Sequence, residues 1–78
     1  MAYTLDRVER ALKDFFNLTE EEARNAIIAS GVANEKDKLT QKALDEEWGT
    51  MEHGEKKITQ KGQQHIGVTV RKIMAKLD

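Results

Sequence analysis

The chain has 78 residues and a formal net charge of −1, so it has room for one small domain with a modest hydrophobic core. It contains no Cys, which excludes disulfide bonds and thiolate zinc sites, and it has no long apolar run, so we expect no transmembrane helix and a location in the cytoplasm. Residues 1–53 carry 7 basic and 12 acidic side chains, a net charge of −5, whereas residues 54–78 carry 6 basic and 2 acidic side chains, a net charge of +4. This asymmetry favours either an anionic partner for the basic segment or complementary charges within the fold.

Residues 5–16 have the apolar spacing of an amphipathic helix. Thr4, just before them, is a suitable N-cap residue. Four apolar residues recur at intervals of three and four, on one face of the expected helix: Leu5, Val8, Leu12 and Phe15. We expect this face to be buried.

A second helix is expected over residues 20–30. Thr19 and Glu22 have the spacing of a capping box, and the acidic residues at 20–22 suit the positive end of the helix dipole. The expected buried face consists mostly of small residues: Ala23, Ala26 and Ile27. Gly31 is a suitable residue for the end of this helix.

A short third helix is expected over residues 41–48. Thr40 is a suitable N-cap residue, and Leu39 and Leu44 have the spacing of a hydrophobic staple around it. Leu44 and Trp48 lie one turn apart, so we expect both to face the core.

Residues 50–58 form the one stretch with an extended pattern, and His53-Gly54 suits the positive φ angles of a tight hairpin turn.

The last helix is expected to follow a Thr59 cap and to run to about residue 76. Its apolar stripe has the spacing of a buried helix face: Ile66, Val70, Ile73 and Leu77. Gly62 lies at the edge of this face, which indicates a close approach between the helix start and a neighbour.

The pattern Lys38-Leu39-Thr40-Gln41-Lys42 recurs as Lys57-Ile58-Thr59-Gln60-Lys61. In both copies an aliphatic residue precedes a Thr whose hydroxyl can accept a hydrogen bond from the first helical turn. The repeat therefore predicts two helix starts. The patterns together predict a single domain over residues 1–78, of the mainly α class with a minor β part: four helices with a short two-stranded hairpin before the last helix.

Basic residues form the first candidate site. If the second and third helices form a helix-turn-helix, Gln41 and Lys42 would face the major groove, while Lys residues of the hairpin and last helix would contact phosphates. The candidate nucleic-acid-binding residues are Gln41, Lys42, Lys56, Lys57, Lys61, Lys72 and Lys76. The acidic run Asp45-Glu46-Glu47 argues against a conventional recognition helix, and the alternative for this segment is a structural helix with a solvated acidic face. The alternative for the Lys residues of the last helix is a solvated helix edge on which the Lys stems cover core surface.

A protein interface is the second candidate site. Trp48, at the end of a helix, is either a core residue or an exposed anchor, and Ile28 and Val68 are the other apolar candidates. Val68 lies opposite the stripe of the last helix, so a homodimer contact is an option there.

Catalysis, metal binding and cofactors are not expected. His53 and His65 are far apart in the sequence and have no further ligand set beside them. The chain has no phosphate-binding Gly loop, and its acidic clusters occur where helix capping explains them.

The segments Leu39-Thr40-Gln41-Lys42-Ala43-Leu44, Trp48-Gly49 and Lys57-Ile58-Thr59-Gln60-Lys61-Gly62 resemble a pattern in the small winged-helix and helix-turn-helix domains of phage and prophage antirepressor-like regulators. The resemblance implies a winged-helix-like fold and a non-enzymatic regulator that binds double-stranded DNA. The acidic front segment favours the alternative, a protein-interaction module (an inhibitor or adaptor) on a similar helical scaffold.

Overall fold

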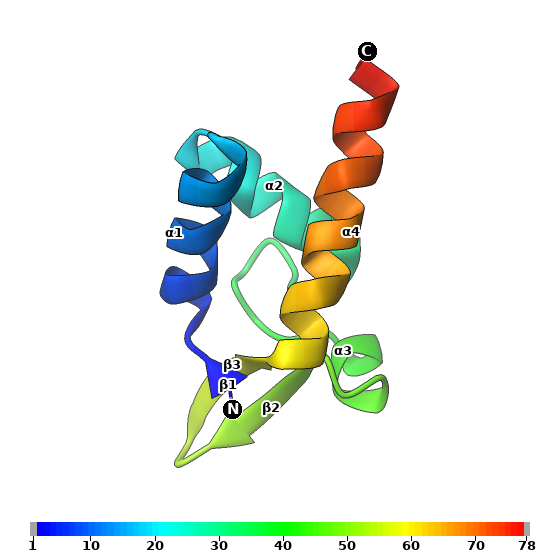
Figure 1. Cartoon of the computed structure of the whole chain (residues 1–78). Helices are drawn as coiled ribbons and strands as arrows, with labels where there is room; N and C mark the ends of the chain where they lie inside the picture. The colour runs from blue at the N-terminus through cyan, green and yellow to red at the C-terminus, as the bar shows by residue number, and fades with distance from the viewer. Residues whose placement is uncertain (1, 78) are drawn as a thin grey trace.

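Four helices and a small antiparallel sheet make up residues 2–77 of the protein (Figure 1). The structure is a computed structural model that describes residues 2–77, with side chains described as far as residue 76. The elements in chain order are β1 (Ala2–Tyr3), α1 (Leu5–Phe16), α2 (Glu20–Ser30), α3 (Gln41–Asp45), β2 (Gly49–Glu52), β3 (Glu55–Thr59) and α4 (Gln60–Leu77). The mainly helical class is confirmed, whereas the expected two-stranded hairpin is part of a three-stranded sheet.

The first two helices have the predicted bounds because side chains cap their starts. The hydroxyl of Thr4 accepts a hydrogen bond from the backbone N–H of Arg7 at 3.2 Å. Thr19 and Glu22 form a reciprocal capping box, with hydrogen bonds of 3.1 and 2.9 Å. Gly31 ends α2 with a φ angle of 84°, a left-handed conformation that glycine adopts without a steric penalty.

The sheet has the strand order β1-β3-β2, and both strand pairs are antiparallel. Strands β2 and β3 form the predicted hairpin, whose turn residues His53 and Gly54 have φ angles of 52° and 75°. Strand β1 was not predicted, because two residues are too few to show the alternation that marks a strand. It adds to the outer edge of β3, where Tyr3 pairs with Ile58.

The core lies between one face of the sheet and the helices. Ile58, on this face, is only 1% exposed, while Thr50 and Thr59 on the other face are half-buried. Helix α4 starts at the sheet and rises beside α2 to the opposite end of the molecule (Figure 1). The buried apolar residues are Val8, Leu12, Ala23, Ala26, Ile27, Val32, Ala33, Ala43, Trp48, Ile58, Ile66 and Val70.

Three residues that were expected in the core are exposed. Phe15 is 75% exposed because its neighbour Phe16 packs against the core instead, and the two rings meet edge to face. Leu44 is 40% exposed because α3 ends one residue later and turns its last residues outward. Ile73 is 39% exposed because it lies in the part of α4 where every described side chain is exposed. The side chain of Leu77, also expected in this stripe, lies outside the described residues.

Helix α3 is shorter than the predicted helix over residues 41–48. It ends at Asp45, and Glu47 has a φ angle of 62° that is incompatible with a continuing helix. The N–H of Trp48 then donates to the carbonyl of Ala43 at 2.8 Å, which closes the chain reversal. This reversal carries Trp48 into the core rather than along the helix surface.

The connection between α2 and α3 is a closed loop of ten residues, 31–40. The side-chain oxygen of Asn34 accepts hydrogen bonds from the N–H groups of Lys36 and Lys38, at 2.9 and 3.1 Å. An ion pair of 3.1 Å between Arg24 and Asp37 ties the loop to α2. A helix-turn-helix has a turn of about three or four residues, so this connection differs from the one that the motif requires.

Candidate functional site

Trp48, just before β2, packs in the core against α4, and α4 contacts the end of α2 at the same place. Its ring stacks on the imidazole of His65 in α4, with the ring centroids 3.8 Å apart and the planes 10° from parallel. The Nε2 atom of His65 lies 2.8 Å from the carbonyl oxygen of Ser30 at the end of α2. Trp48 is only 8% exposed, so the interpretation of this residue as an exposed anchor is wrong and the core interpretation is correct.

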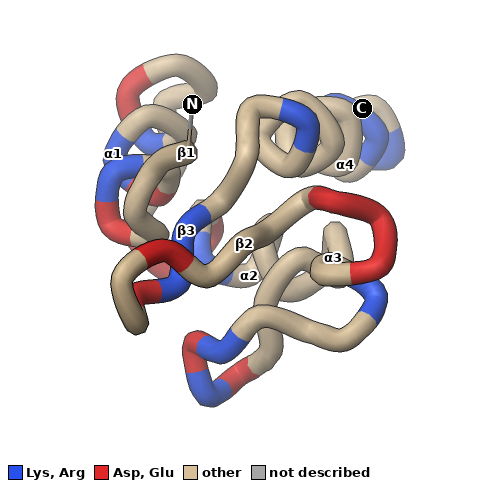
Figure 2. The backbone as a smooth tube through the Cα atoms, turned by 90° about the horizontal axis from the view of Figure 1, so that it is seen from below, with Lys and Arg blue, Asp and Glu red and all other residues tan. Residues whose placement is uncertain are grey.

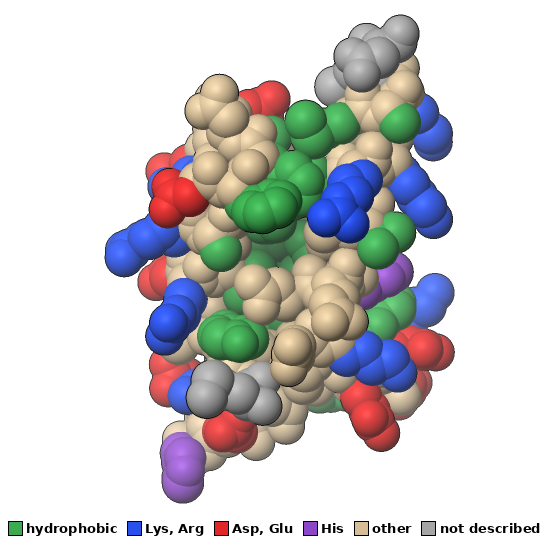
Figure 3. Space-filling model, viewed as in Figure 1, with side chains coloured by type: hydrophobic (Ala, Val, Ile, Leu, Met, Phe, Trp, Pro, Cys, Tyr) green, Lys and Arg blue, Asp and Glu red, His purple; other side chains and the backbone are tan. Residues whose placement is uncertain are grey.

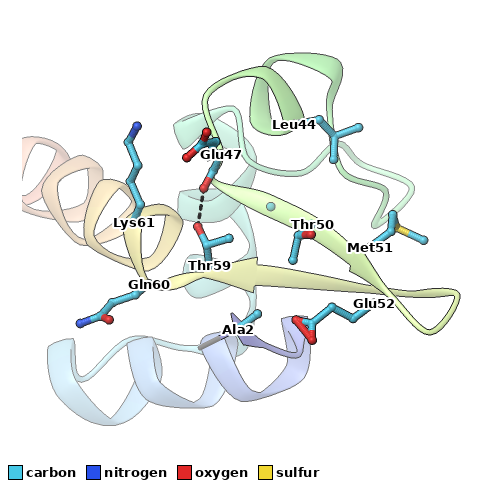
Figure 4. Close-up of a pocket in the computed structure, with 10 residues that line it drawn as sticks. Ala2, Leu44, Glu47, Thr50, Met51, Glu52, Thr59, Gln60 and Lys61 are labelled. Atoms are coloured by element: carbon cyan, nitrogen blue, oxygen red, sulfur yellow. Dashed lines mark hydrogen bonds between the residues drawn. The ribbon is translucent and has the colours of Figure 1, made fainter.

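The two predicted helix starts of the repeat are confirmed. The hydroxyl of Thr40 accepts a hydrogen bond from the N–H of Ala43, and that of Thr59 accepts one from the N–H of Gly62, both at 3.0 Å. Each hydroxyl also donates to a carbonyl that precedes it in the chain, Thr40 to Gly31 and Thr59 to Glu47. The Thr59–Glu47 bond forms one wall of a hollow at the sheet end of the molecule (Figure 4).

Two hollows lie at this end, and we call them together with their lining residues the hairpin-end surface. The first has a volume of about 970 Å³ and lies between α3, the edge strand β2 and the start of α4 (Figure 4). The second has a volume of about 500 Å³ and lies beside the hairpin turn. The charged and large apolar residues that line the two hollows are Lys38, Leu39, Leu44, Glu47, Met51, Glu52, Glu55, Lys56 and Lys61.

Leu44 and Met51 line both hollows. They are 40% and 57% exposed, so the hairpin-end surface has an apolar centre that water reaches. Met51 pairs with Lys56 and Gly49 pairs with Ile58, so Met51 lies on the same sheet face as buried Ile58 but farther along the hairpin. Sequence reasoning missed Met51, although the two-residue alternation from Gly49 could have placed it on this face.

Charges of both signs surround the apolar centre. Glu47, Glu52 and Lys61 line the first hollow, and Glu55, Lys38 and Lys56 line the second. Seen from below, the acidic stretch after α3 lies beside the start of α4, and the basic residues of β3 follow the acidic hairpin tip (Figure 2). The hairpin-end surface is therefore not a uniformly positive face.

The basic candidates fall into two groups. Lys56 and Lys57 are half-buried on β3, and Lys61 is exposed in the first turn of α4. Lys72 is also exposed, but it lies roughly 16 Å of helical rise beyond Lys61, and Lys76 lies one turn farther. The fold brings the first three residues to the sheet end and carries the other two toward the opposite end.

The two candidates on α3 contact residues of their own region. The side-chain nitrogen of Gln41 donates to Asp45 at 3.0 Å. The Nζ atom of Lys42 lies 5.9 Å from the centre of the Trp48 ring, within the range of a cation–π contact. Both side chains are exposed.

The other apolar candidates differ in their surroundings. Ile28 is half-buried and lines a hollow of about 500 Å³ next to Gly31 and Thr40. Val68 is 44% exposed on α4, as its position opposite the stripe predicted.

Comparison with family models, curated proteins and solved structures finds no match to this chain. The functional conclusion therefore depends on the site itself.

Two further findings concern the part of the chain that the structure describes. Within residues 2–77, no group of three or more His, Cys, Asp or Glu residues could hold a metal ion. None of the helices in this range has the length and apolar character needed to cross a membrane.

Proposed function

We propose that this chain is a protein-interaction module that binds its partner through the hairpin-end surface. The observation that supports this proposal is the exposed pair Leu44 and Met51, which lines two adjacent hollows. Exposed apolar residues that adjoin hollows are typical of binding sites in small domains. An apolar side chain of the partner would enter a hollow and exclude water from both residues.

The charges around this pair agree with a protein partner. Specific protein interfaces have an apolar centre and a polar rim, and they need no excess of one charge. Glu47, Glu52 and Lys61 supply such a rim around the first hollow. A duplex would instead have to approach these carboxylates against charge repulsion.

The test uses the chain as an affinity bait. The double variant Leu44→Glu/Met51→Glu places charges at the apolar centre, and because both residues are exposed its fold should be unchanged. Val68→Glu is the matched control, since Val68 is exposed to a similar degree at 44% on α4. We expect a partner that binds the wild type and the control, and whose affinity for the double variant is at least about tenfold lower when both proteins are purified. Equal affinity for all three would refute the proposed surface.

A second candidate function is a small non-enzymatic regulator of the winged-helix type that contacts double-stranded DNA. The observation that favours it is a hairpin directly before the last helix, with Lys56, Lys57 and Lys61 at this end of the molecule. In this proposal the hairpin and the start of α4 contact phosphates while Gln41 and Lys42 approach base edges. It ranks second because α3 has only five residues and is followed by two glutamates.

Titration with a short mixed-sequence duplex at low and physiological salt tests this second function. Lys57→Glu/Lys61→Glu should weaken binding across sequences and reduce the salt dependence, because phosphate contacts release counterions. Lys72→Glu/Lys76→Glu makes the same charge change farther along α4 and serves as the control. If the wild type does not bind even at low salt, the DNA proposal fails and the protein-interaction proposal is unaffected.

A further inference from the structure

Strand β2 forms one edge of the sheet, with β3 on one side and α3 on the other (Figure 4). Its pairing with β3 runs without a bulge from Gly49–Ile58 to Glu52–Glu55. The strand contains neither Pro nor Lys. Bulges, Pro and Lys are features that commonly stop an edge strand from pairing with another chain. The backbone of β2 therefore lacks these obstacles to a further strand.

The hairpin turn determines which backbone groups of β2 face outward. Glu52 and Glu55 flank the two-residue turn and form a hydrogen-bonded pair, so Thr50 is the next residue whose N–H and C=O groups face β3. The N–H and C=O groups of Gly49 and Met51 point away from β3. Within the described part of the chain, no backbone hydrogen bond outside the hairpin reaches either residue. Both line the first hollow, so their outward groups are open to a ligand there.

The two hollows of the hairpin-end surface match the two faces of such a strand. Thr50 and Glu52 have side chains on the open face of the sheet and line only the first hollow, whereas Lys56, on the core face, lines only the second. Side chains of an added strand alternate between the two faces, so consecutive side chains would enter the two hollows in turn. A helical segment would instead present side chains three or four positions apart.

The linings of the two hollows favour different side chains. The first hollow has two carboxylates, Glu47 and Glu52, and one cation, Lys61, and acidic side chains gather around α3 beside the start of α4 in Figure 3. The second hollow combines Leu39 and the shared apolar pair with two lysines and one glutamate. A basic side chain is therefore favoured in the first hollow and an apolar one in the second.

We propose that the partner binds as an extended segment that adds a strand to the open edge of β2 and alternates basic with apolar side chains. This proposal rests on the proposed function, because it names the class of partner for the hairpin-end surface. The N–H and C=O groups of Met51 bond to the backbone of the segment, and its side chains occupy the two hollows. Since β2 has four residues, a segment of about five residues spans it.

A blocked pentapeptide tests the proposal, with lysine at the first, third and fifth positions and valine between them. We expect it to bind with a Kd below one millimolar and to shift the amide resonances of β2. Two further peptides carry N-methyl groups, one on both valines and the other on the third and fifth residues. Only alternate residues of an added strand donate to the edge, so one methylated form should bind about tenfold or more weakly and the other like the unmodified peptide.

Two variants of the protein test the same contact from the other side. Met51→Pro removes the outward N–H, and the hairpin should persist because this N–H does not face β3. Met51→Thr is the matched control, since it also removes the long apolar side chain but keeps the N–H. We expect the Pro variant to bind the pentapeptide about tenfold more weakly than the Thr variant. Amide spectra of the free variants show whether the hairpin is intact.

Three results would overturn the proposal. The first is a pentapeptide that does not bind at millimolar concentration, and the second is an equal effect of the two methylation patterns. The third is equal affinity of Met51→Pro and Met51→Thr for the peptide. A partner protein that distinguishes the Leu44→Glu/Met51→Glu variant from the wild type, but binds Met51→Pro and Met51→Thr equally, would leave the proposed surface in place and reject strand addition alone.

Discussion

Gly62, in the first turn of α4, lies directly against the backbone carbonyl of Trp48. A Cβ atom added at Gly62 would overlap the carbonyl oxygen and come within 2.8 Å of the carbonyl carbon. The same oxygen accepts a hydrogen bond from the N–H of Thr59 at 2.9 Å. The start of the last helix and the entry into β2 are therefore in contact through backbone atoms, which have little freedom to move apart.

Gly62→Ala should destabilise the protein by about 2–3 kcal/mol, because the clash is with backbone rather than with a flexible side chain. Gly67→Ala in the same helix is the control: a Cβ there meets nothing within 4 Å, so the better helix propensity of Ala should stabilise by up to about 1 kcal/mol. Urea unfolding followed by the fluorescence of the single Trp measures both. Two changes of the same sign would contradict this account.

Thr59→Ala should lower the free energy of unfolding by about 1 kcal/mol, the usual cost of losing an N-cap. The reason is that the hydroxyl accepts from the N–H of Gly62 and donates to the carbonyl of Glu47. Thr59→Ser keeps the hydroxyl and should remain close to the wild type. An unchanged thermal melt for Thr59→Ala would show that the second copy of the repeat is not a functional cap.

His65→Ala should cost about 1–3 kcal/mol, the sum expected for one aromatic stack and one net hydrogen bond. The stack is with Trp48 and the hydrogen bond is with the carbonyl of Ser30. His65→Phe retains a stacking ring without a polar nitrogen, so it should recover part of the loss. If the Phe variant is no more stable than the Ala variant in chemical denaturation, the stack contributes nothing.

The capping box at the start of α2 makes stability depend on pH. Hydrogen bonds with Thr19 hold the pKa of the Glu22 carboxyl below its ordinary value, the larger effect coming from the backbone N–H and the smaller one from the hydroxyl. A carboxyl whose pKa is lowered by folding stabilises the folded state above its unfolded pKa, and this contribution disappears as the pH falls through the folded pKa. Glu22→Gln should therefore lose less stability than the wild type on acidification from about pH 5 to about pH 3.

Glu21→Gln is the control for this measurement. It removes a neighbouring exposed carboxylate from the same helical turn without removing the capping box. In thermal melts across this pH range, the melting temperature of Glu22→Gln should therefore fall less on acidification than that of the wild type, whereas the melting temperature of Glu21→Gln should fall as much as that of the wild type. An equal effect of both substitutions would mean that the general charge of the helix start, rather than the box, sets the pH dependence.

Local signals account for the parts of the fold that could be predicted from the sequence. The bounds of α1 and α2, the hairpin turn and both repeat caps depend on residues within a few positions of one another, such as Thr19 with Glu22 or His53 with Gly54. Hydrogen bonds and backbone conformations of this kind are determined within a single turn. The close approach at Gly62 was predicted from its place on the helix face, although its partner was not.

The remaining parts depend on contacts between distant segments. Trp48 is buried because His65, seventeen positions later, stacks on it, and helical spacing alone could not distinguish this core position from an exposed anchor. The candidate site was largely missed, since Leu44 was expected in the core and Met51 was not considered. Exposure of these two residues follows from where α3 ends and how far the hairpin extends beyond the helices, and no periodicity encodes either property.

The pairing of Tyr3 with Ile58 has a consequence for how the domain assembles. The hairpin β2–β3 closes across a two-residue turn, whereas β1 joins β3 only by closing the fifty-five positions that separate these two residues. Closing a short loop costs less entropy and takes less time than closing a long one. We therefore expect β2 and β3 to pair first, and β1 to join the edge of β3 only after the helices between them have brought the two strands together.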